Sequence, residues 1–333
     1  MMATMPGTAL HPEDNWSLSK PTKILVTGGA GFIGTNLCAT LRSAGHEVTA
    51  FDNLSVSNAN VALLESLGVS IVVGDVSNFE EVLTVAKDNA VIFHLAAMNR
   101  AQRSIDQPII AHHANITGTL HVLEAARRFK ARVVFVSSSS VYAGRDGLLQ
   151  EDSALAPLHP YGVGKLAGEH YARVYHELFG LPVATLRLFS VYGPYQLGTI
   201  DKAGVVAKYI HNARTGAKLP VYGEGQQLRT FTYVSDVVRS LILAANSDKA
   251  NGKIINIANP HEVSVLELAK AIASATKTQS EIAHEAALKG DPARNPADVT
   301  RARELLEYVP QVSLESGIAQ TVAWYDSQAR SKH

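Results

Sequence analysis

Residues 23–34 read Lys-Ile-Leu-Val-Thr-Gly-Gly-Ala-Gly-Phe-Ile-Gly, and this stretch decides the fold. A short apolar run comes first and predicts a buried strand. Gly28, Gly31 and Gly34 follow it, and a helical pattern begins at Phe32. Glycines allow a tight turn and a close approach of backbone to a pyrophosphate, and the start of a helix offers free N–H groups to an anion. This stretch therefore predicts a dinucleotide-binding unit.

The alternation of apolar runs with helical patterns continues along the chain. Further runs rich in β-branched residues predict strands at 48–51, 71–73, 91–93, 133–136 and 183–188. Helical patterns lie between them, for example at 117–129 and 161–179. Wholly apolar strands that alternate with helices are typical of a parallel sheet covered on both faces. We therefore expect an α/β fold with a doubly wound parallel sheet of the Rossmann type.

The pattern changes after about residue 190. Loops rich in Gly and Pro alternate there with shorter elements, and we expect strands at 231–233 and 254–257 and helices at 264–276 and 314–328. We interpret this part as a smaller C-terminal substrate-binding lobe. The expected division is a flexible tail at 1–20, an NAD-binding domain at 21–188 with returning segments at about 229–257, and the substrate-binding lobe at 189–228 and 258–330.

The composition argues against several classes of function. The chain has 30 basic and 30 acidic side chains, so it has no bulk electrostatic attraction to nucleic acid or to an anionic membrane. We see neither a signal-peptide pattern nor an apolar run long enough to span a bilayer. The single cysteine, Cys38, excludes an intrachain disulfide, and we expect a cytoplasmic protein. His112 and His113 are adjacent and do not have a metal-ligand spacing, so we expect no metal site.

Acidic residues follow two of the predicted strands. Asp52 ends the second strand, about where a carboxylate should accept from both adenosine ribose hydroxyls. Its charge would repel a 2′-phosphate, which favours NAD over NADP, although Asp52-Asn53 is also good turn chemistry. Asp75 follows the third strand and has two equal interpretations: it accepts from the adenine amine, or it caps the next helix.

A candidate catalytic pair occurs in Tyr161-Gly-Val-Gly-Lys165, where the i, i+4 spacing places both side chains on one helix face. An ammonium beside a phenol favours the phenolate, so we expect Lys165 to lower the pKa of Tyr161 from about 10. Ser137–Ser140 follow the fifth predicted strand, at the sheet edge that faces the ligand crevice. Alone, these patterns fit a solvated helix face and a serine-rich loop. Combined with the glycine loop, they predict a site that moves a proton through Tyr161 and a hydride through NAD.

The chain from about Lys23 to the last predicted helix resembles an extended short-chain dehydrogenase/reductase of the nucleotide-sugar epimerase/dehydratase family, closest in motif to UDP-sugar 4-epimerases. The motifs that carry this resemblance are T-G-G-A-G-F-I-G at 27–34, D-N-L-S at 52–55, H-L-A-A at 94–97, S-S-S-S-V-Y at 137–142, Y-G-V-G-K at 161–165, L-R-L-F-S-V-Y-G-P at 186–194 and G-E-G-Q-Q-L-R-T-F-T-Y-V-S-D at 223–236.

The resemblance implies roles for individual residues. Tyr161 would remove a proton from a sugar hydroxyl, Lys165 would bind the nicotinamide ribose, and Ser138 takes the place of the family's catalytic Ser or Thr. Arg229 would hold the substrate diphosphate, for which a guanidinium is well suited. The implied cofactor-binding residues are Gly28, Gly31, Phe32, Ile33, Gly34, Asp52, Asn53, Asp75, Val76, Leu95, Ala96, Ala97, Tyr161 and Lys165. The implied substrate-binding residues are Ser138, Ser139, Ser140, Ser190, Arg229, Arg294 and Asn295.

The sequence departs from the family pattern around the substrate. Ser190 stands where the family often has Asn, and Leu288 stands where it has an arginine that Lys289 or Arg294 could replace. Asn295 falls where a residue limits the size of the sugar pocket, and a side chain smaller than tyrosine leaves room for an N-acetyl group.

The second step of the reaction separates the members of the family. Dehydratases carry an Asp-Glu pair where this chain has Ser139 and Ser140, and decarboxylases often carry a glutamate at the second position. Serine does not titrate near neutral pH, so we expect a 4-epimerase that forms a transient 4-keto sugar and returns the hydride. The substrate would be a UDP-glucose, UDP-GlcNAc or UDP-glucuronate type sugar, since the serine row could bond a C6 carboxylate or a C6 hydroxyl.

Other functions stay open at this point. The alternatives are a dehydratase, decarboxylase or reductase of the same family, and a non-catalytic dinucleotide sensor. The resemblance also implies a homodimer that forms through a four-helix bundle, with the segments at about 103–128 and 161–180 supplying the helices.

Overall fold

The computed structural model describes residues 21–142, 147–196, 204–287, 294 and 296–330. The first part of the chain alternates strands and helices in the order β1 (Lys23–Thr27), α1 (Phe32–Ser43), β2 (Glu47–Asp52), α2 (Val61–Ser66), β3 (Ser70–Val73), α3 (Phe79–Ala86), β4 (Val91–His94), α4 (Ala101–Asp106), α5 (Pro108–His112), a π-helix (His113–Thr117), α6 (Gly118–Phe129), β5 (Arg132–Ser138), a 3₁₀ turn (Ser139–Tyr142), α7 (Pro160–Phe179) and β6 (Val183–Leu188).

The second part contains shorter elements. They are β7 (Val191–Tyr192), α8 (Val205–Thr215), β8 (Leu219–Tyr222), β9 (Leu228–Thr230), β10 (Thr232–Tyr233), α9 (Val234–Asn246), a 3₁₀ turn (Asp248–Ala250), β11 (Ile254–Ile257), β12 (Glu262–Ser264), α10 (Val265–Thr276), β13 (Ile282–Glu285), α11 (Thr300–Leu306) and α12 (Leu314–Arg330).

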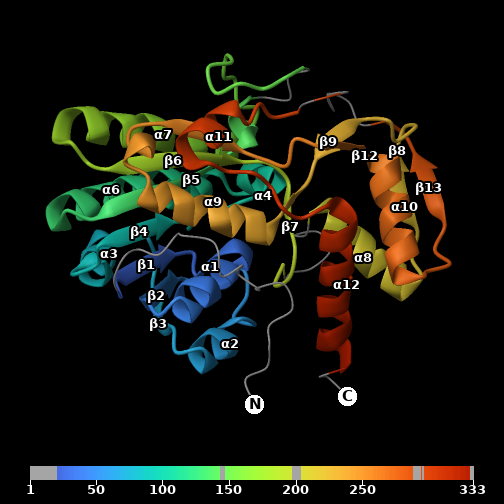
Figure 1. The fold of residues 1–333 in the computed structure, drawn as a ribbon, viewed down its shortest axis with the longest axis horizontal. Helices are drawn as coiled ribbons and strands as arrows, with labels where there is room; N and C mark the ends of the chain where they lie inside the picture. The colour runs from blue at the N-terminus through green and yellow to red at the C-terminus, as the bar shows by residue number, and fades with distance from the viewer. Residues whose placement is uncertain (1–20, 143–146, 197–203, 288–293, 295, 331–333) are drawn as a thin grey trace.

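The main sheet has seven strands in the order β11-β6-β5-β4-β1-β2-β3, and all of its pairings are parallel. Helices α3, α6 and α7 pack on one face, while α1, α9 and α11 cover the other (Figure 1). The doubly wound α/β fold predicted from the alternating pattern is therefore confirmed. The strand order reverses direction between β1 and β4, which is the point where such sheets bind their ligands.

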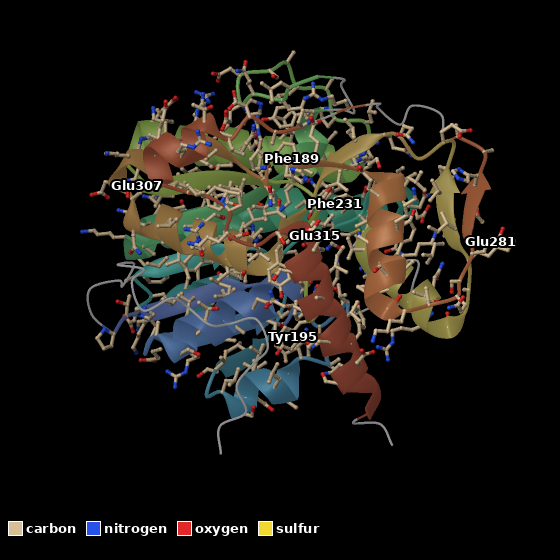
Figure 2. The ribbon with its side chains drawn as sticks, turned by 45° about the vertical axis from the view of Figure 1, so that its right-hand side comes forward. Phe189, Tyr195, Phe231, Glu281, Glu307 and Glu315 are labelled. Carbon is tan, nitrogen blue, oxygen red and sulfur yellow. The ribbon has the colours of Figure 1, made fainter. Side chains whose placement is uncertain are left out.

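The C-terminal elements gather at one end of the main sheet. Helices α8 and α10 pack together there, β8 pairs with β13, and α12 packs against α10 (Figure 1). The strand β11 returns to the main sheet beside β6, whereas β9 pairs with β12 and β10 pairs with β7. In Figure 2, Phe189 and Phe231 lie in the middle of the molecule and Glu281 at its far edge; both phenylalanines are buried in the larger of the two apolar clusters.

The ends of α7 show how the sequence sets these elements. The His159 side chain accepts from the Gly162 N–H, Pro160 occupies the first turn, and the helix ends at Gly180 with a φ of 65°. The segment 103–128 differs from the single helix expected for it. Pro108 starts a new helix after α4 has ended, and a π-helical turn precedes α6.

Candidate active site

The carboxyl ends of five neighbouring strands bring the predicted site residues to one edge of the main sheet. The glycine loop follows β1, Asp52 ends β2, residues 95–97 follow β4, and Ser138 ends β5. Ser190 lies beyond the end of β6, whose Leu188 is in register with Ser138. The pairing is parallel throughout, so these residues share one crevice although they lie far apart in the sequence.

The glycine loop has the shape that a pyrophosphate requires. Gly28 has a φ of +70°, and a Cβ on it would lie 2.7 Å from the Ala96 nitrogen. A Cβ on Gly34 would lie 2.2 Å from the Gly28 carbonyl oxygen, so α1 can approach the loop only without a side chain there. Gly31 precedes α1, and no side chain caps the first turn, which contains Phe32 and Ile33. These N–H groups and the positive end of the helix dipole fit the diphosphate of NAD.

The acidic residues lie beside this loop. Asp52 is half-buried; one of its carboxylate oxygens accepts from the Ala30 N–H (3.1 Å) and the other from the Leu54 N–H (2.8 Å). Burial raises the pKa of Asp52, and these backbone donors oppose the rise. Asp75 accepts from the Asn53 amide at 2.7 Å and from the Ser77 N–H at 2.8 Å. The interpretation of Asp75 as a helix cap is wrong, because Asn78 caps α3.

The segment that follows β4 packs against the glycine loop at Gly28. His94 is fully buried between the Thr27 and Thr119 hydroxyls, at 2.8 and 3.0 Å, and burial lowers its pKa to about 3. The Ala96 N–H donates to the Thr27 hydroxyl at 3.3 Å. Leu95 and Ala97 flank Ala96 in an extended stretch. Val76 is buried and lies against Gly118.

Tyr161 and Ser138 meet across the crevice. The Ser138 hydroxyl lies close enough to the Tyr161 hydroxyl to oppose the rise of the Tyr161 pKa. The Ser138 oxygen accepts from the Ser140 N–H and is bonded to the Ser140 hydroxyl, both at 3.1 Å. The close approach of α7 needs Gly162, because a Cβ there would lie 2.8 Å from the Ser140 carbonyl oxygen. The structure therefore brings together two of the three predicted catalytic side chains.

Lys165 lies next to this pair but does not have the predicted effect on Tyr161. Its ammonium donates to the Val136 carbonyl at 2.7 Å and lies 6.0 Å from the centre of the Tyr161 ring. The pKa of Tyr161 is raised, not lowered as we predicted, because burial outweighs the stabilising effects of Ser138 and of Arg100. Burial also lowers the pKa of Lys165 to about 7, and the Glu169 carboxylate opposes this shift.

A buried ionic network lies behind Lys165 and was not found by sequence reasoning. Glu169, one turn after Lys165, accepts from the Ser137 hydroxyl at 2.5 Å and forms a two-point ion pair with Arg187 at 2.9 and 2.7 Å. Both charged side chains are only 1% exposed. The spacing of four residues between Lys165 and Glu169 was the available signal, since it places a carboxylate on the inward helix face.

The predicted substrate residues lie in two places. Ser139 and Ser140 are half-buried next to Ser138, and Ser190 is exposed with a φ of 32°. Arg229 lies on β9, half-buried, and one of its guanidinium nitrogens donates to the Leu228 carbonyl at 2.7 Å. An isolated backbone bridge between Leu228 and Arg294 brings Arg294 beside β9, which carries Arg229.

Arg294 is already paired in this structure. Its guanidinium bonds to Glu262 at 2.6–2.9 Å on the surface. Asn295, Leu288 and Lys289 lie outside the described residues, so the expectations for them are untested. In the part of the chain that the structure describes, no group of three or more His, Cys, Asp or Glu side chains has the arrangement of a metal site. A search of the same residues finds no helix long and apolar enough to cross a membrane.

A Rossmann sheet with an open glycine cradle and a Ser138–Tyr161–Lys165 cluster at its switch point defines an NAD-dependent enzyme of the short-chain dehydrogenase/reductase type. The family model described as "NAD dependent epimerase/dehydratase family" matches residues 24–258. The chain therefore belongs to this family.

Individual relatives match over nearly the whole chain. The UDP-glucose 4-epimerase of Mycolicibacterium smegmatis is 35% identical, over 92% of this chain and 100% of that protein. The UDP-N-acetyl-alpha-D-glucosaminuronate decarboxylase of Bacillus cytotoxicus is 34% identical, over 91% and 97%. The solved UDP-glucuronic acid 4-epimerase of Bacillus cereus, in complex with UDP-glucuronic acid and NAD, is 32% identical with a TM-score of 0.83, over 92% of this chain and 99% of that one.

Proposed function

We propose that this protein is an NAD-dependent nucleotide-sugar 4-epimerase. The observation that carries the proposal is the pair of hydroxyl side chains, Ser139 and Ser140, beside the Ser138–Tyr161 contact. A proton-transfer pair is present there, but the neighbouring positions hold no acid that could eliminate water. The relatives named above include two 4-epimerases, which supports the same conclusion.

Each catalytic side chain has a definite task in this proposal. Tyr161 accepts the proton of the sugar C4 hydroxyl while C4 loses a hydride, and it returns the proton after the 4-keto sugar has presented its other face. Ser138 bonds the same substrate oxygen, and Lys165 holds the nicotinamide ribose and adds positive charge near Tyr161. NAD, when bound, supplies the hydride acceptor and a positively charged ring that favours the Tyr161 phenolate.

The diphosphate of the substrate would be held by Arg229. Arg294, which is bridged to Leu228 on β9, is our candidate for the missing family arginine, and it would have to exchange Glu262 for phosphate. We propose the division of the chain that the sequence analysis predicts. Residues 21–188, with returning segments at about 229–257, would bind NAD, and residues 189–228 and 258–330 would bind the sugar nucleotide. A cytoplasmic location agrees with the single buried cysteine.

The function is tested by incubating the purified protein with UDP-glucose, UDP-N-acetylglucosamine and UDP-glucuronate and following the products by NMR. We expect reversible inversion at C4 without net reduction of NAD. Decarboxylation and dehydration are the alternatives with support, because a decarboxylase and a dTDP-glucose 4,6-dehydratase are among the relatives. Release of carbon dioxide would favour decarboxylation, and a lasting 4-keto-6-deoxy sugar would favour a dehydratase; either product would exclude our proposal.

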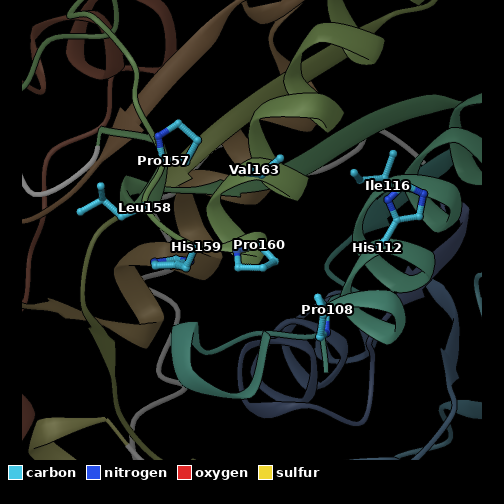
Figure 3. Close-up of a pocket in the computed structure, with 8 residues that line it drawn as sticks. All are labelled: Pro108, His112, Ile116, Pro157, Leu158, His159, Pro160 and Val163. Atoms are coloured by element: carbon cyan, nitrogen blue, oxygen red, sulfur yellow. The ribbon is translucent and has the colours of Figure 1, made fainter. Parts of the chain in front are cut away.

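We also propose a homodimer that forms through α5 and α7. Large apolar side chains are exposed on these helices: Ile109 (69%), Ile110 (55%) and Val163 (48%). Figure 3 shows a pocket between the two helices that Pro108, His112, Ile116, Pro157, Leu158, His159, Pro160 and Val163 line. Large exposed apolar side chains on two helices that pack together are what a protein interface would cover.

The oligomeric state is tested by light scattering after size exclusion. We expect a dimer for the unaltered protein and a monomer for Ile109→Glu. Val309→Glu is the matched control, because Val309 is also exposed (53%) but lies far from these helices in sequence, after α11. A monomeric unaltered protein would contradict the proposal.

A further inference from the structure

Arg100 has a backbone conformation that an arginine rarely adopts. It precedes α4 with a φ of 85° and a ψ of 122°, a backbone conformation in which any residue other than glycine is strained. Its neighbours fix this conformation from both sides. The buried Asn115 amide binds both the N–H and the carbonyl of Met98, at 2.8 and 3.1 Å, and Ser104 accepts from the Tyr161 N–H at 3.1 Å. Strain that is held so firmly is characteristic of functional sites.

The side chain of Arg100 lies in the crevice. Its Nε atom is buried and has no hydrogen-bond partner among the described residues. One terminal nitrogen is 3.8 Å from where a Cβ on Gly204 would lie, so the guanidinium lies close to the residue that precedes α8. Arg100 and the Tyr161 phenol are close enough to interact electrostatically, and burial lowers the pKa of Arg100.

No carboxylate of a described residue forms an ion pair with Arg100. Arg100 is half-buried, and a cation that is partly removed from water without an anion is costly, which leaves a ligand as the natural partner. The diphosphate has a separate proposed place at Arg229 on β9. The Tyr161 hydroxyl must meet the C4 oxygen of the sugar, so a cation beside it lies within reach of the substituents on the two adjacent carbons, C3 and C5. Of these, the C5 substituent, C6, is the one that is a carboxylate in a uronic acid.

We propose that Arg100 recognises a carboxylate at C6, so that the substrate is a nucleotide-diphosphate uronic acid. A guanidinium binds a carboxylate with two parallel hydrogen bonds, and the Ser139 and Ser140 hydroxyls can donate to the same group. A neutral C6 hydroxyl would leave the Arg100 charge without a partner. This inference rests on the proposed 4-epimerase function and names its substrate class.

The test compares the binding of UDP-glucuronate and UDP-glucose to the NAD-loaded protein by calorimetry, together with kcat and KM for C4 inversion. Two variants remove the cation. Arg100→Met keeps most of the side-chain volume, and Arg100→Gly relieves the backbone strain, so it should fold at least as well as the unaltered protein. The control is Arg303→Met, because Arg303 is an exposed arginine on α11, outside the proposed site.

We expect the unaltered protein to bind and invert UDP-glucuronate in preference to UDP-glucose. Both Arg100 variants should weaken UDP-glucuronate binding by about 10–100-fold, the usual effect of losing a hydrogen-bonded charged partner. Binding of UDP-glucose should change by less than about threefold, and Arg303→Met should change neither ligand.

Three outcomes would overturn this inference without touching the 4-epimerase proposal. The first is a preference of the unaltered protein for UDP-glucose. The second is an equal loss for both sugars with an alkaline shift of the pH–rate profile, which would show that Arg100 acts on Tyr161 alone. The third is unchanged UDP-glucuronate binding in Arg100→Gly. Absence of C4 inversion with every sugar would instead remove the proposed function itself.

Discussion

Replacement of Arg187 by methionine tests whether the buried ion pair sustains both the fold and the charge of Lys165. Arg187 makes four hydrogen bonds: two to Glu169, one to the Tyr142 hydroxyl (2.7 Å) and one to the Glu151 carbonyl (3.0 Å). Without Arg187, the Glu169 carboxylate stays buried with only the Ser137 hydroxyl as a donor. Removing one partner of a buried pair typically lowers the free energy of unfolding by about 3–5 kcal/mol. We expect a loss of about 4 kcal/mol in Arg187→Met.

The assay is urea denaturation followed by circular dichroism at pH 7. The control is Arg173→Met, which breaks the exposed Arg173–Glu177 pair and should lower the free energy of unfolding by only about 0–1 kcal/mol. The double variant Arg187→Met/Glu169→Met removes both charges and should recover most of the stability. It also removes the carboxylate that opposes the lowered pKa of Lys165, so the double variant should bind NAD more weakly than the unaltered protein although it is folded. A loss below about 1 kcal/mol in Arg187→Met would refute this reasoning.

The remaining predictions concern the cofactor and the catalytic pair. Gly28→Ala should weaken NAD binding, measured by fluorescence titration. The positive φ of Gly28 and the Ala96 backbone oppose a Cβ there, with a strain of about 1–3 kcal/mol. An unchanged affinity would contradict the role of the glycine loop in binding the NAD diphosphate. Asp52→Asn should raise the affinity for NADP relative to NAD, and a constant ratio would show that Asp52 only orders the loop. Tyr161→Phe should lower kcat by about 10²–10⁴-fold with unchanged NAD binding, and full activity would defeat the mechanism. Lys165 has a pKa of about 7 in the folded chain, below its unfolded value of 10.5, so the unfolded chain binds more protons between these values and the stability rises with pH across that window. Lys165→Met should therefore unfold at a higher temperature than the unaltered protein near pH 7, and the difference between the two melting temperatures should narrow toward pH 10. A difference that does not change with pH would contradict the lowered pKa of Lys165.

The strands and helices of the main sheet were predictable, because they follow the pattern of apolar residues along the sequence. Short runs rich in apolar and β-branched residues, such as 133–136 and 183–188, favour buried strands, and the glycine loop between a strand and a helix has a well-defined geometry. Pro108 is the sequence signal for the break within 103–128, because a proline disfavours the interior of a helix, and the expectation of a single helix there took no account of it. Pairings of short segments such as β9 with β12 depend on tertiary contacts that no local pattern records.

The chemistry of the site was less predictable than its location. The i, i+4 spacing placed Tyr161 and Lys165 on one face, but it could not show that the ammonium binds Val136 or that burial dominates the pKa of Tyr161. Arg100 was missed for a similar reason. Its importance lies in a positive φ and an unpartnered Nε, and neither has a signature in the sequence.

The place of β11 in the main sheet has a consequence for how the protein is made. Strand β6 is buried along its whole length, and β11 is the neighbour that covers its outer edge. The same strand supplies Asn256, which binds Tyr142 and the Leu149 carbonyl. On the ribosome, β6 is complete well before residue 254 emerges, so an apolar strand edge stays open during synthesis. A nascent chain that stalls in this interval presents a pairing surface to its neighbours, and a truncated gene product ending before β11 should collect in inclusion bodies.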